Sequence, residues 1–179
     1  MKRVGILTSG GDCQGLNAAI RGVAKGLYQE FGKEVEIYGI KDGYKGLIFG
    51  EYKKMEERDF SGILTLGGTI LGTSRQPFKT IRVIDENSVD KVKSMKENYK
   101  KMKLDCLVIL GGNGTQKTAN LLSQEGLNVI HLPKTIDNDL VHTDHTPGYG
   151  SAAKYIASTI KEIICDSSVY ELNSVTVVE

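Results

Sequence analysis

The chain has 179 residues, a formal net charge of +1, 40% hydrophobic residues and 25% charged residues. This balance is ordinary for a globular protein that buries one core, and it excludes a disordered or fibrous chain. Basic and acidic residues are interspersed, so no broad positive surface is available for nucleic acid or for an anionic membrane. The three cysteines form no CxxC pair and no apolar run reaches membrane-spanning length, which together favour a reduced, cytoplasmic protein.

Short β-branched runs alternate with longer segments of helical period, a pattern that predicts an α/β fold with a doubly wound, mostly parallel sheet. The predicted strands are Arg3–Leu7, Glu34–Tyr38, Cys106–Leu110, Asn128–Leu132 and Val175–Val178. The predicted helices are Leu16–Phe31, Glu86–Lys101, Thr115–Gln124 and Gly148–Ile164. Apolar residues recur at helical spacing in the first and last helices, so we expect one face of each to pack on the sheet.

The first predicted strand is followed by a glycine-rich turn, Gly10-Gly-Asp-Cys-Gln-Gly-Leu-Asn17. An ordinary strand-to-helix turn is one interpretation, because a lone glycine pair is weak evidence of function. Asp12 and Asn17 favour a functional turn, since capping the next helix needs only one short polar side chain. The residues match neither the dinucleotide-binding fingerprint nor the Walker A pattern.

Two further glycine-rich segments carry residues suited to phosphate. Gly111-Gly-Asn-Gly-Thr115 follows an apolar run and can bring bare backbone N–H groups close to phosphate oxygens. The segment Gly67–Arg75 ends in an arginine, whose guanidinium is suited to stabilising a travelling phosphoryl group. A structural turn and a surface arginine are the alternative interpretations.

The strongest single signal is Thr135-Ile-Asp-Asn-Asp139, which follows Lys134 and places two carboxylates, an amide and a hydroxyl on one turn. One carboxylate can accept a hydroxyl proton while the other holds a metal or orients its neighbour. A turn stabilised by Asx hydrogen bonds is the alternative. Together with glycine turns at the ends of successive strands, this segment predicts phosphoryl transfer.

Six motifs stand in order along the chain: GGDCQGLNAAIRG, GYKGL, GGTILGTSR, LGGNGT, PKTIDND and TPGYGSA. They resemble the phosphofructokinase family from Arg3 to Glu179, but only the first half of a family member. The resemblance implies a glycolytic kinase that moves the terminal phosphoryl group of ATP to the C1 hydroxyl of fructose 6-phosphate, with Mg²⁺ and in a homo-oligomer. It also implies that residues 1–179 form the donor-binding domain and the start of a substrate domain, in a chain cut short before the second domain.

The same resemblance implies roles for individual residues. Asp137 would be the general base, and Arg75 would contact the donor and the transition state. The donor would be bound by Gly11, Arg75, Gln76, Gly112, Asn113, Gly114 and Thr115. The sugar phosphate would be bound by Thr135, Ile136 and Asp137, and the metal by Asn113 and Asp139. Because Asn113 replaces the family's aspartate ligand, the metal would depend more on phosphate oxygens, water and Asp139.

Two positions bear on the choice of donor, and here they disagree. Gly114 resembles the ATP-dependent members, since an aspartate at this position would put a carboxylate against the α-phosphate of ATP. Lys134 resembles the pyrophosphate-dependent members, but a lysine there does not exclude ATP. We therefore expect ATP as the donor, with pyrophosphate as the alternative.

Two other classes of function stay open at this point. A lipid or NAD kinase would share a turn like Gly111–Thr115 but would lack the TIDND segment. A nucleotide-binding fragment without activity would keep the donor half alone. The resemblance also places Arg21 and Lys25 where bacterial ATP-dependent relatives bind an effector, with a solvated helix face as the alternative.

Overall fold

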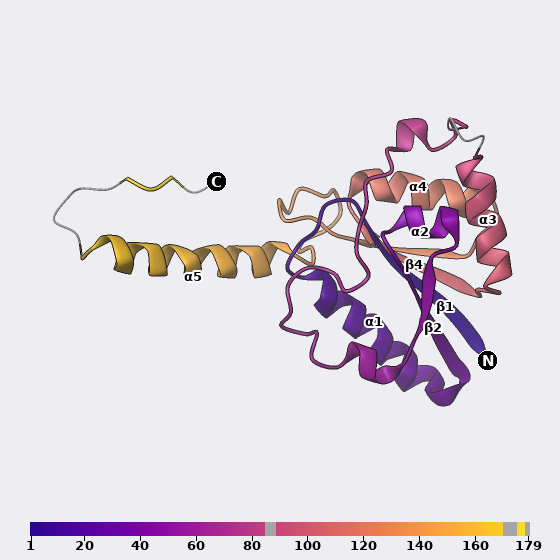
Figure 1. Ribbon diagram of the computed structural model, residues 1–179, viewed down its shortest axis with the longest axis horizontal. Coiled ribbons are helices and arrows are strands. Elements are labelled where there is room, and N and C mark those ends of the chain that lie inside the picture. The colour runs from indigo at the N-terminus through magenta and orange to yellow at the C-terminus, as the bar shows by residue number, and fades with distance from the viewer. Residues whose placement is uncertain (85–88, 170–174, 178–179) are drawn as a thin grey trace.

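The computed structural model describes residues 1–84, 89–169 and 175–177. Its body is a five-stranded sheet covered by helices, and the last helix projects away from this body (Figure 1). The strands are β1 (Lys2–Ser9), β2 (Val35–Ile40), β3 (Tyr52–Met55), β4 (Cys106–Gly111) and β5 (Val129–Pro133). The helices are α1 (Leu16–Phe31), α2 (Tyr44–Phe49), α3 (Lys91–Lys101), α4 (Asn113–Gln124) and α5 (Tyr149–Ser167).

The strand order in space is β3-β2-β1-β4-β5. β1 pairs in parallel with both β2 and β4, β4 pairs in parallel with β5, and β3 runs antiparallel to β2. From β1 the chain first adds β2 and β3 on one side, and it later adds β4 and β5 on the other side. In open α/β sheets the crevice at such a reversal, outside the carboxyl ends of the strands, is where ligands bind.

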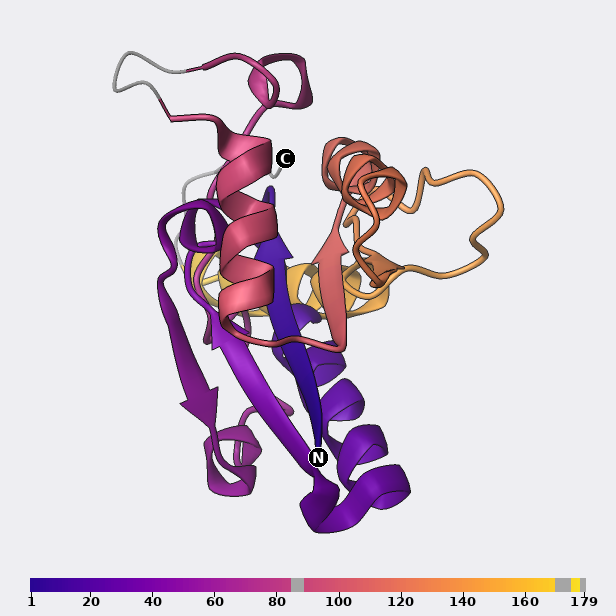
Figure 2. The same ribbon diagram turned by 90° about the vertical axis from the view of Figure 1, so that its right-hand side faces the viewer.

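Helices cover both faces of the sheet, with α1 on one side and α2, α3 and α4 on the other (Figure 2). Ile20 of α1 packs with Ile6 of β1 in the first core. Leu122 of α4 and Met95 of α3 pack in the second core with Leu7 of β1. The alternating sides of Ile6 and Leu7 follow from the two-residue period of a strand, which lets β1 contribute to both cores.

The mostly parallel α/β sheet predicted from the sequence is confirmed. The predicted helix at Glu86 instead begins at Lys91, because the Asp90 carboxylate accepts the N–H of Lys93 at 3.0 Å and caps it there. Residues 86–88 lie outside the described part of the chain. The sequence pattern does not predict α2 or β3, because both are too short, and β3 is too polar, for a clear periodic signal.

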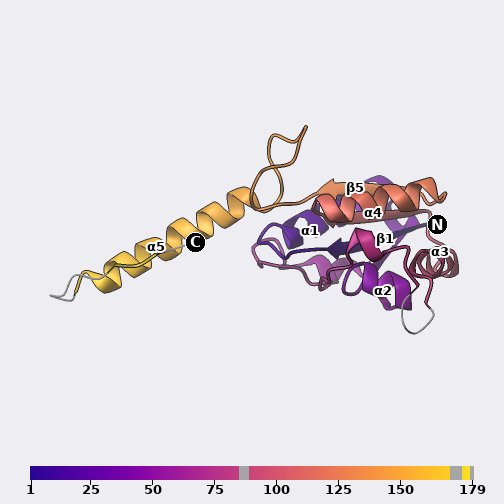
Figure 3. The same cartoon turned by 90° about the horizontal axis from the view of Figure 1, so that it is seen from above.

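The prediction that the apolar face of α5 packs on the sheet is wrong. Figure 3 shows α5 extending from one end of the body, and of its apolar residues Ala152 is the one that is buried. Tyr155 is 62% exposed and Ile164 is 60% exposed. Periodic spacing identifies an apolar helix face, but it does not identify the surface that covers this face.

The predicted strand Val175–Val178 is also wrong for its described residues. Val175 and Val177 are irregular and are 91% and 88% exposed, while Val178 lies outside the described residues. A β-branched run becomes a strand only when a neighbouring strand satisfies its backbone N–H and C=O groups. Across residues 1–84, 89–169 and 175–177, no helix has both the length and the apolar character needed to cross a bilayer.

We expect the half-buried His131 on β5 to make the stability of this fold sensitive to acid. Its Nε2 has no hydrogen-bond partner among the described residues, and burial lowers the pKa of the imidazole. Below about pH 6.5, the usual pKa of histidine, the unfolded chain binds a proton that the folded chain resists, so the free energy of unfolding falls. We predict that the free energy of unfolding, measured with urea, falls less between about pH 7.5 and pH 5.5 in His131→Gln than in wild type.

His142 supplies the control for this measurement because its side chain is exposed. His142→Gln should keep the pH dependence of wild type. An identical pH dependence in wild type and His131→Gln would contradict the assignment.

Candidate functional site

A cleft of about 800 Å³ lies at the carboxyl ends of β1, β4 and β5, where the winding of the sheet reverses. The structure brings to this cleft every residue that was predicted to bind the donor, the sugar phosphate or the metal, to act in catalysis, or to select the donor. They are Gly11, Arg75, Gln76, Gly112, Asn113, Gly114, Thr115, Lys134, Thr135, Ile136, Asp137 and Asp139. Asp12 and Gly10 of the first glycine turn also line the cleft, as do four residues to which the sequence gave no role, namely Ser9, Pro77, Phe78 and Leu140. In the sequence, these four residues are marked only by their positions next to the motif residues.

The first glycine turn begins where β1 ends, at Ser9. Gly10 has a φ of +93°, a backbone conformation that side chains other than glycine's rarely adopt. Its N–H donates to the carbonyl of Ser74 at 3.2 Å. The N–H of Gly11 donates to no acceptor in the described part of the chain, so it is available to an anion in the cleft.

The second glycine turn leads directly from β4 into α4. Gly112 is the N-cap of this helix, no side chain caps it, and its first turn carries no acidic residue. The first N–H groups of a helix lack internal partners and, with the helix dipole, favour a bound anion. An added Cβ at Gly114 would meet no atom within 4 Å, so the space beside this turn is open.

The ends of β1 and β4 approach each other closely at these two turns. A Cβ on Gly111 would lie 2.6 Å from the Ser9 carbonyl oxygen, so only glycine fits there. The Thr115 hydroxyl donates to the same carbonyl at 3.2 Å. The two glycine turns, whose unpaired backbone N–H groups can bind phosphate, are therefore held side by side.

Arg75 reaches the cleft from the Gly67–Arg75 segment, which is fixed to the start of α1. The buried Asn17 side chain accepts the N–H of Ile70 at 2.7 Å and donates to the carbonyl of Leu66 at 3.0 Å. Arg75 itself is exposed and forms no ion pair within the described residues. Its guanidinium is thus free to contact an anion.

Asn138 holds the carboxylate turn in place after β5. It has a φ of +52°, a conformation that asparagine tolerates better than most residues. Its side chain donates to the Asp144 carbonyl and accepts the N–H of Thr146, both at 3.2 Å. The interpretation as an Asx-stabilised turn therefore fits Asn138. Asp137 and Asp139 are not needed for these two bonds, so their carboxylates can contact a ligand.

The carboxylates of Asp137 and Asp139 are exposed at the cleft and share one neighbour, the Thr135 hydroxyl. The Thr135 Oγ1 lies 3.5 Å from Oδ2 of Asp137 and 3.2 Å from Oδ1 of Asp139. A hydroxyl has one proton to donate, so it serves one carboxylate at a time. The remaining oxygens can accept a proton from a ligand or bind a cation.

The oxygen donors of the cleft fit a hard divalent cation. Asp139 and Asp12 supply carboxylates and Asn113 supplies an amide. No cluster of three or more His, Cys, Asp or Glu side chains suited to a metal exists within residues 1–84, 89–169 and 175–177. Mg²⁺ characteristically uses one or two carboxylates together with water and phosphate oxygens, which matches this sparse set.

Lys134 lies beneath the carboxylate turn and is only 7% exposed. Its ammonium donates to the carbonyl of Gly11, and its backbone N–H donates to the carbonyl of Gly111 at 3.0 Å. One residue at the end of β5 therefore contacts both glycine turns. Its positive charge at the floor of the cleft favours an anionic ligand.

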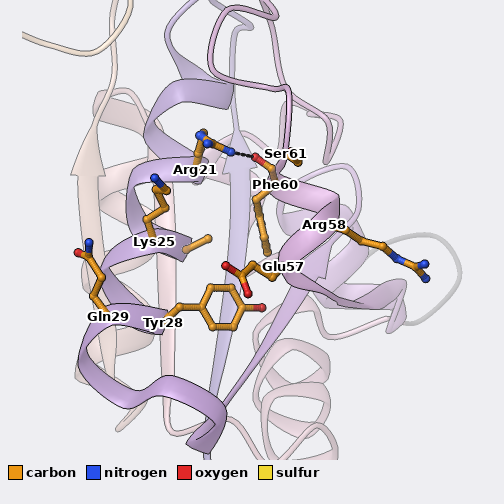
Figure 4. Close-up of a pocket in the computed structure, with 9 residues that line it drawn as sticks. Arg21, Lys25, Tyr28, Gln29, Glu57, Arg58, Phe60 and Ser61 are labelled. Atoms are coloured by element: carbon orange, nitrogen blue, oxygen red, sulfur yellow. Dashed lines mark hydrogen bonds between the residues drawn. The ribbon is translucent and has the colours of Figure 1, made fainter.

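A separate pocket of about 620 Å³ lies between α1 and the short helical turn Glu57–Phe60 (Figure 4). Arg21 and Lys25 extend into it from α1, and Arg21 Nη1 donates to the carbonyl of Phe60. The two basic residues singled out in the sequence therefore line one pocket, away from the cleft at the sheet.

The chain matches the family model described as phosphofructokinase over residues 3–179. It is 55% identical over 178 residues to the ATP-dependent 6-phosphofructokinase of Spirochaeta thermophila, covering 98% of this chain and 48% of that protein. It is 48% identical over 161 residues to the enzyme of the same name from Propionibacterium freudenreichii, covering 90% of this chain and 42% of that protein. The chain thus spans about half the length of the curated relatives it matches.

Solved structures give the same result for the fold. Phosphofructokinase from Saccharomyces cerevisiae superposes with a TM-score of 0.78 at 29% identity, covering 93% of this chain and 24% of that chain. A pyrophosphate-dependent phosphofructokinase from Nitrosospira multiformis superposes with a TM-score of 0.75 at 26% identity, covering 92% of this chain and 42% of that chain.

Proposed function

Because this chain belongs to the phosphofructokinase family, we propose that it is the donor-binding part of a glycolytic 6-phosphofructokinase. The reaction transfers the terminal phosphoryl group of ATP to the C1 hydroxyl of fructose 6-phosphate and yields fructose 1,6-bisphosphate. One observation carries the proposal: two phosphate-ready backbone turns and a carboxylate turn line a single cleft. Residues 1–179 would supply the donor domain and the start of a substrate domain, where the exposed apolar face of α5 supports further packing.

The proposed mechanism assigns the proton to Asp137. The C1 oxygen forms a bond to the terminal phosphorus of ATP while the bond from this phosphorus to the leaving ADP oxygen breaks. As this happens, the Asp137 carboxylate accepts the hydroxyl proton. Arg75 stabilises the negative charge on the phosphoryl group in transit. Thr135 and Ile136 line the part of the cleft assigned to the sugar phosphate. Holding donor and acceptor in line supplies much of the rate acceleration.

The donor would lie along both glycine turns. Its phosphates would meet the backbone of Gly11 and the α4 start at Gly112–Thr115, with Gln76 beside Arg75 at the edge of the cleft. Asn113 and Asp139 would hold Mg²⁺, with Asp139 as the charged ligand. When bound there, the ion would neutralise charge on the phosphates and orient them.

ATP is the donor that the open space beside Gly114 supports best. Lys134 supports pyrophosphate as the alternative, although its ammonium is already engaged by a backbone carbonyl. We also propose a cytoplasmic homo-oligomer, with no nucleic acid or membrane partner. The earlier lipid- or NAD-kinase alternative is wrong, because the family match runs through residues 3–179.

Substitution at Gly114 tests the donor assignment. Gly114→Asp should weaken ATP binding roughly tenfold or more by placing like charge against the α-phosphate, and should leave pyrophosphate binding near wild type. Gly114→Ala is the matched control, because its methyl group enters open space. Calorimetric titration of both donors checks this. Equal losses for both donors in Gly114→Asp would contradict the assignment.

Substitution at Asp137 tests the proposed function itself. In the full-length gene product, Asp137→Ser should lower kcat by about 10²–10⁴-fold with a much smaller change in KM, because it removes the base. Asp139→Asn should instead raise the Mg²⁺ concentration needed for half-maximal rate. The measurement is phosphoryl transfer to fructose 6-phosphate, with NAD as a parallel acceptor. A near wild-type kcat in Asp137→Ser, with chemistry limiting turnover, would show that the base lies elsewhere.

The Arg21–Lys25 pocket supports an anionic effector such as ADP or phosphoenolpyruvate. We expect Lys25→Ala to abolish the response of the full-length gene product to these compounds while leaving its activity without them unchanged. Lys33→Ala, at an exposed position just beyond α1, is the control and should keep the response. A wild-type enzyme that ignores both compounds would end this proposal.

A further inference from the structure

Three consecutive carbonyls, those of Ser9 at the end of β1 and of Gly10 and Gly11 in the first glycine turn, each accept a hydrogen bond from a different segment of the chain. The Ser9 carbonyl accepts from the Thr115 hydroxyl at 3.2 Å. The Gly10 carbonyl accepts from the Thr73 hydroxyl at 2.7 Å, and the Gly11 carbonyl accepts from the Lys134 ammonium. The three donors come from α4, from the loop before Arg75 and from the end of β5. The turn is therefore fixed from three sides.

These bonds matter because of the geometry of the peptide unit. A trans peptide is planar, so the C=O of one residue and the N–H of the next point in opposite directions. Holding the Gly10 carbonyl at Thr73 therefore fixes the direction of the Gly11 N–H. A turn that binds an anion must present its N–H groups and keep its carbonyl oxygens away.

Adjacent glycines would not keep this orientation by themselves. Glycine has the widest choice of backbone conformations, so Gly10 and Gly11 lose the most freedom when the turn is fixed. The Thr73 side chain supplies the restraint, and it is not itself a lining residue of the cleft. We propose that Thr73 is a positioning residue, whose hydroxyl orients the Gly11 N–H toward the donor phosphate.

The same loop links this orientation to Arg75. The Ser74 carbonyl accepts the N–H of Gly10 at 3.2 Å, and the Ser74 hydroxyl donates to the Asp42 carbonyl at 2.5 Å. Thr73 and Ser74 thus hold both sides of Gly10, directly before the arginine. The backbone that leads into Arg75 and the peptide unit before the Gly11 N–H are consequently held together. The inference rests on the proposed function in one respect, that the anion is the donor phosphate.

Two substitutions separate the hydroxyl of Thr73 from its shape. Thr73→Val keeps the branched outline but removes the donor, whereas Thr73→Ser keeps the donor. Calorimetric titration of the 179-residue chain with MgATP and with inorganic pyrophosphate should show about five- to tenfold weaker binding in Thr73→Val, because one hydrogen bond is lost. Thr73→Ser should stay within about twofold of wild type.

Amide hydrogen exchange supplies a readout that needs no ligand. The Gly10 N–H donates to the Ser74 carbonyl, next to Thr73, so it should exchange faster in Thr73→Val than in wild type or Thr73→Ser. The exchange rate of the Ile109 N–H in β4 should be unchanged. If wild type binds neither MgATP nor pyrophosphate, the proposed donor site fails, and the exchange at Gly10 still decides the role of Thr73. Unchanged Gly10 exchange in Thr73→Val, unchanged binding in a ligand-binding chain, or equal losses in both variants would overturn the inference.

Discussion

The candidate site depends on the close approach of two strand ends. Glycine at position 111 lets β4 come within contact of the Ser9 carbonyl at the end of β1, and Thr115 hydrogen-bonds across the gap. The approach sets the first glycine turn beside the uncapped start of α4. As a result, the unpaired N–H groups of the two turns border the same cleft. The remaining contacts, from Lys134 and Thr73, hold this junction in place.

Much of the fold and site could be predicted from local chemistry. β-branched runs separated by segments of helical period predict a parallel sheet. The carboxyl ends of parallel strands lie at the same edge, so the glycine turns that follow β1 and β4 must meet there. The carboxylate turn follows β5 and joins the same edge for the same reason. Convergence of these residues was therefore a consequence of topology, although their roles remain proposals.

What could not be predicted depends on contacts between distant segments. Nothing near Thr73 in the sequence indicates that its hydroxyl donates to the Gly10 carbonyl. A lysine is expected on the surface, but Lys134 is only 7% exposed in the structure. The apolar faces of α5 and of Val175–Val177 carried clear patterns, yet those patterns describe a surface and not its partner. Asn17 favoured a functional interpretation of the first glycine turn, and in the structure its side chain holds the loop that carries Arg75.

The most direct test of the account is an amide NMR titration of the nitrogen-15-labelled chain with MgATP. If the donor lies where the strand ends meet, the largest shifts will fall on Gly11 and on residues 112–115, at the two glycine turns of the cleft. Shifts confined to the pocket of Arg21 and Lys25 would place the nucleotide elsewhere. Shifts at neither place would contradict the claim that this junction of strands is a donor site.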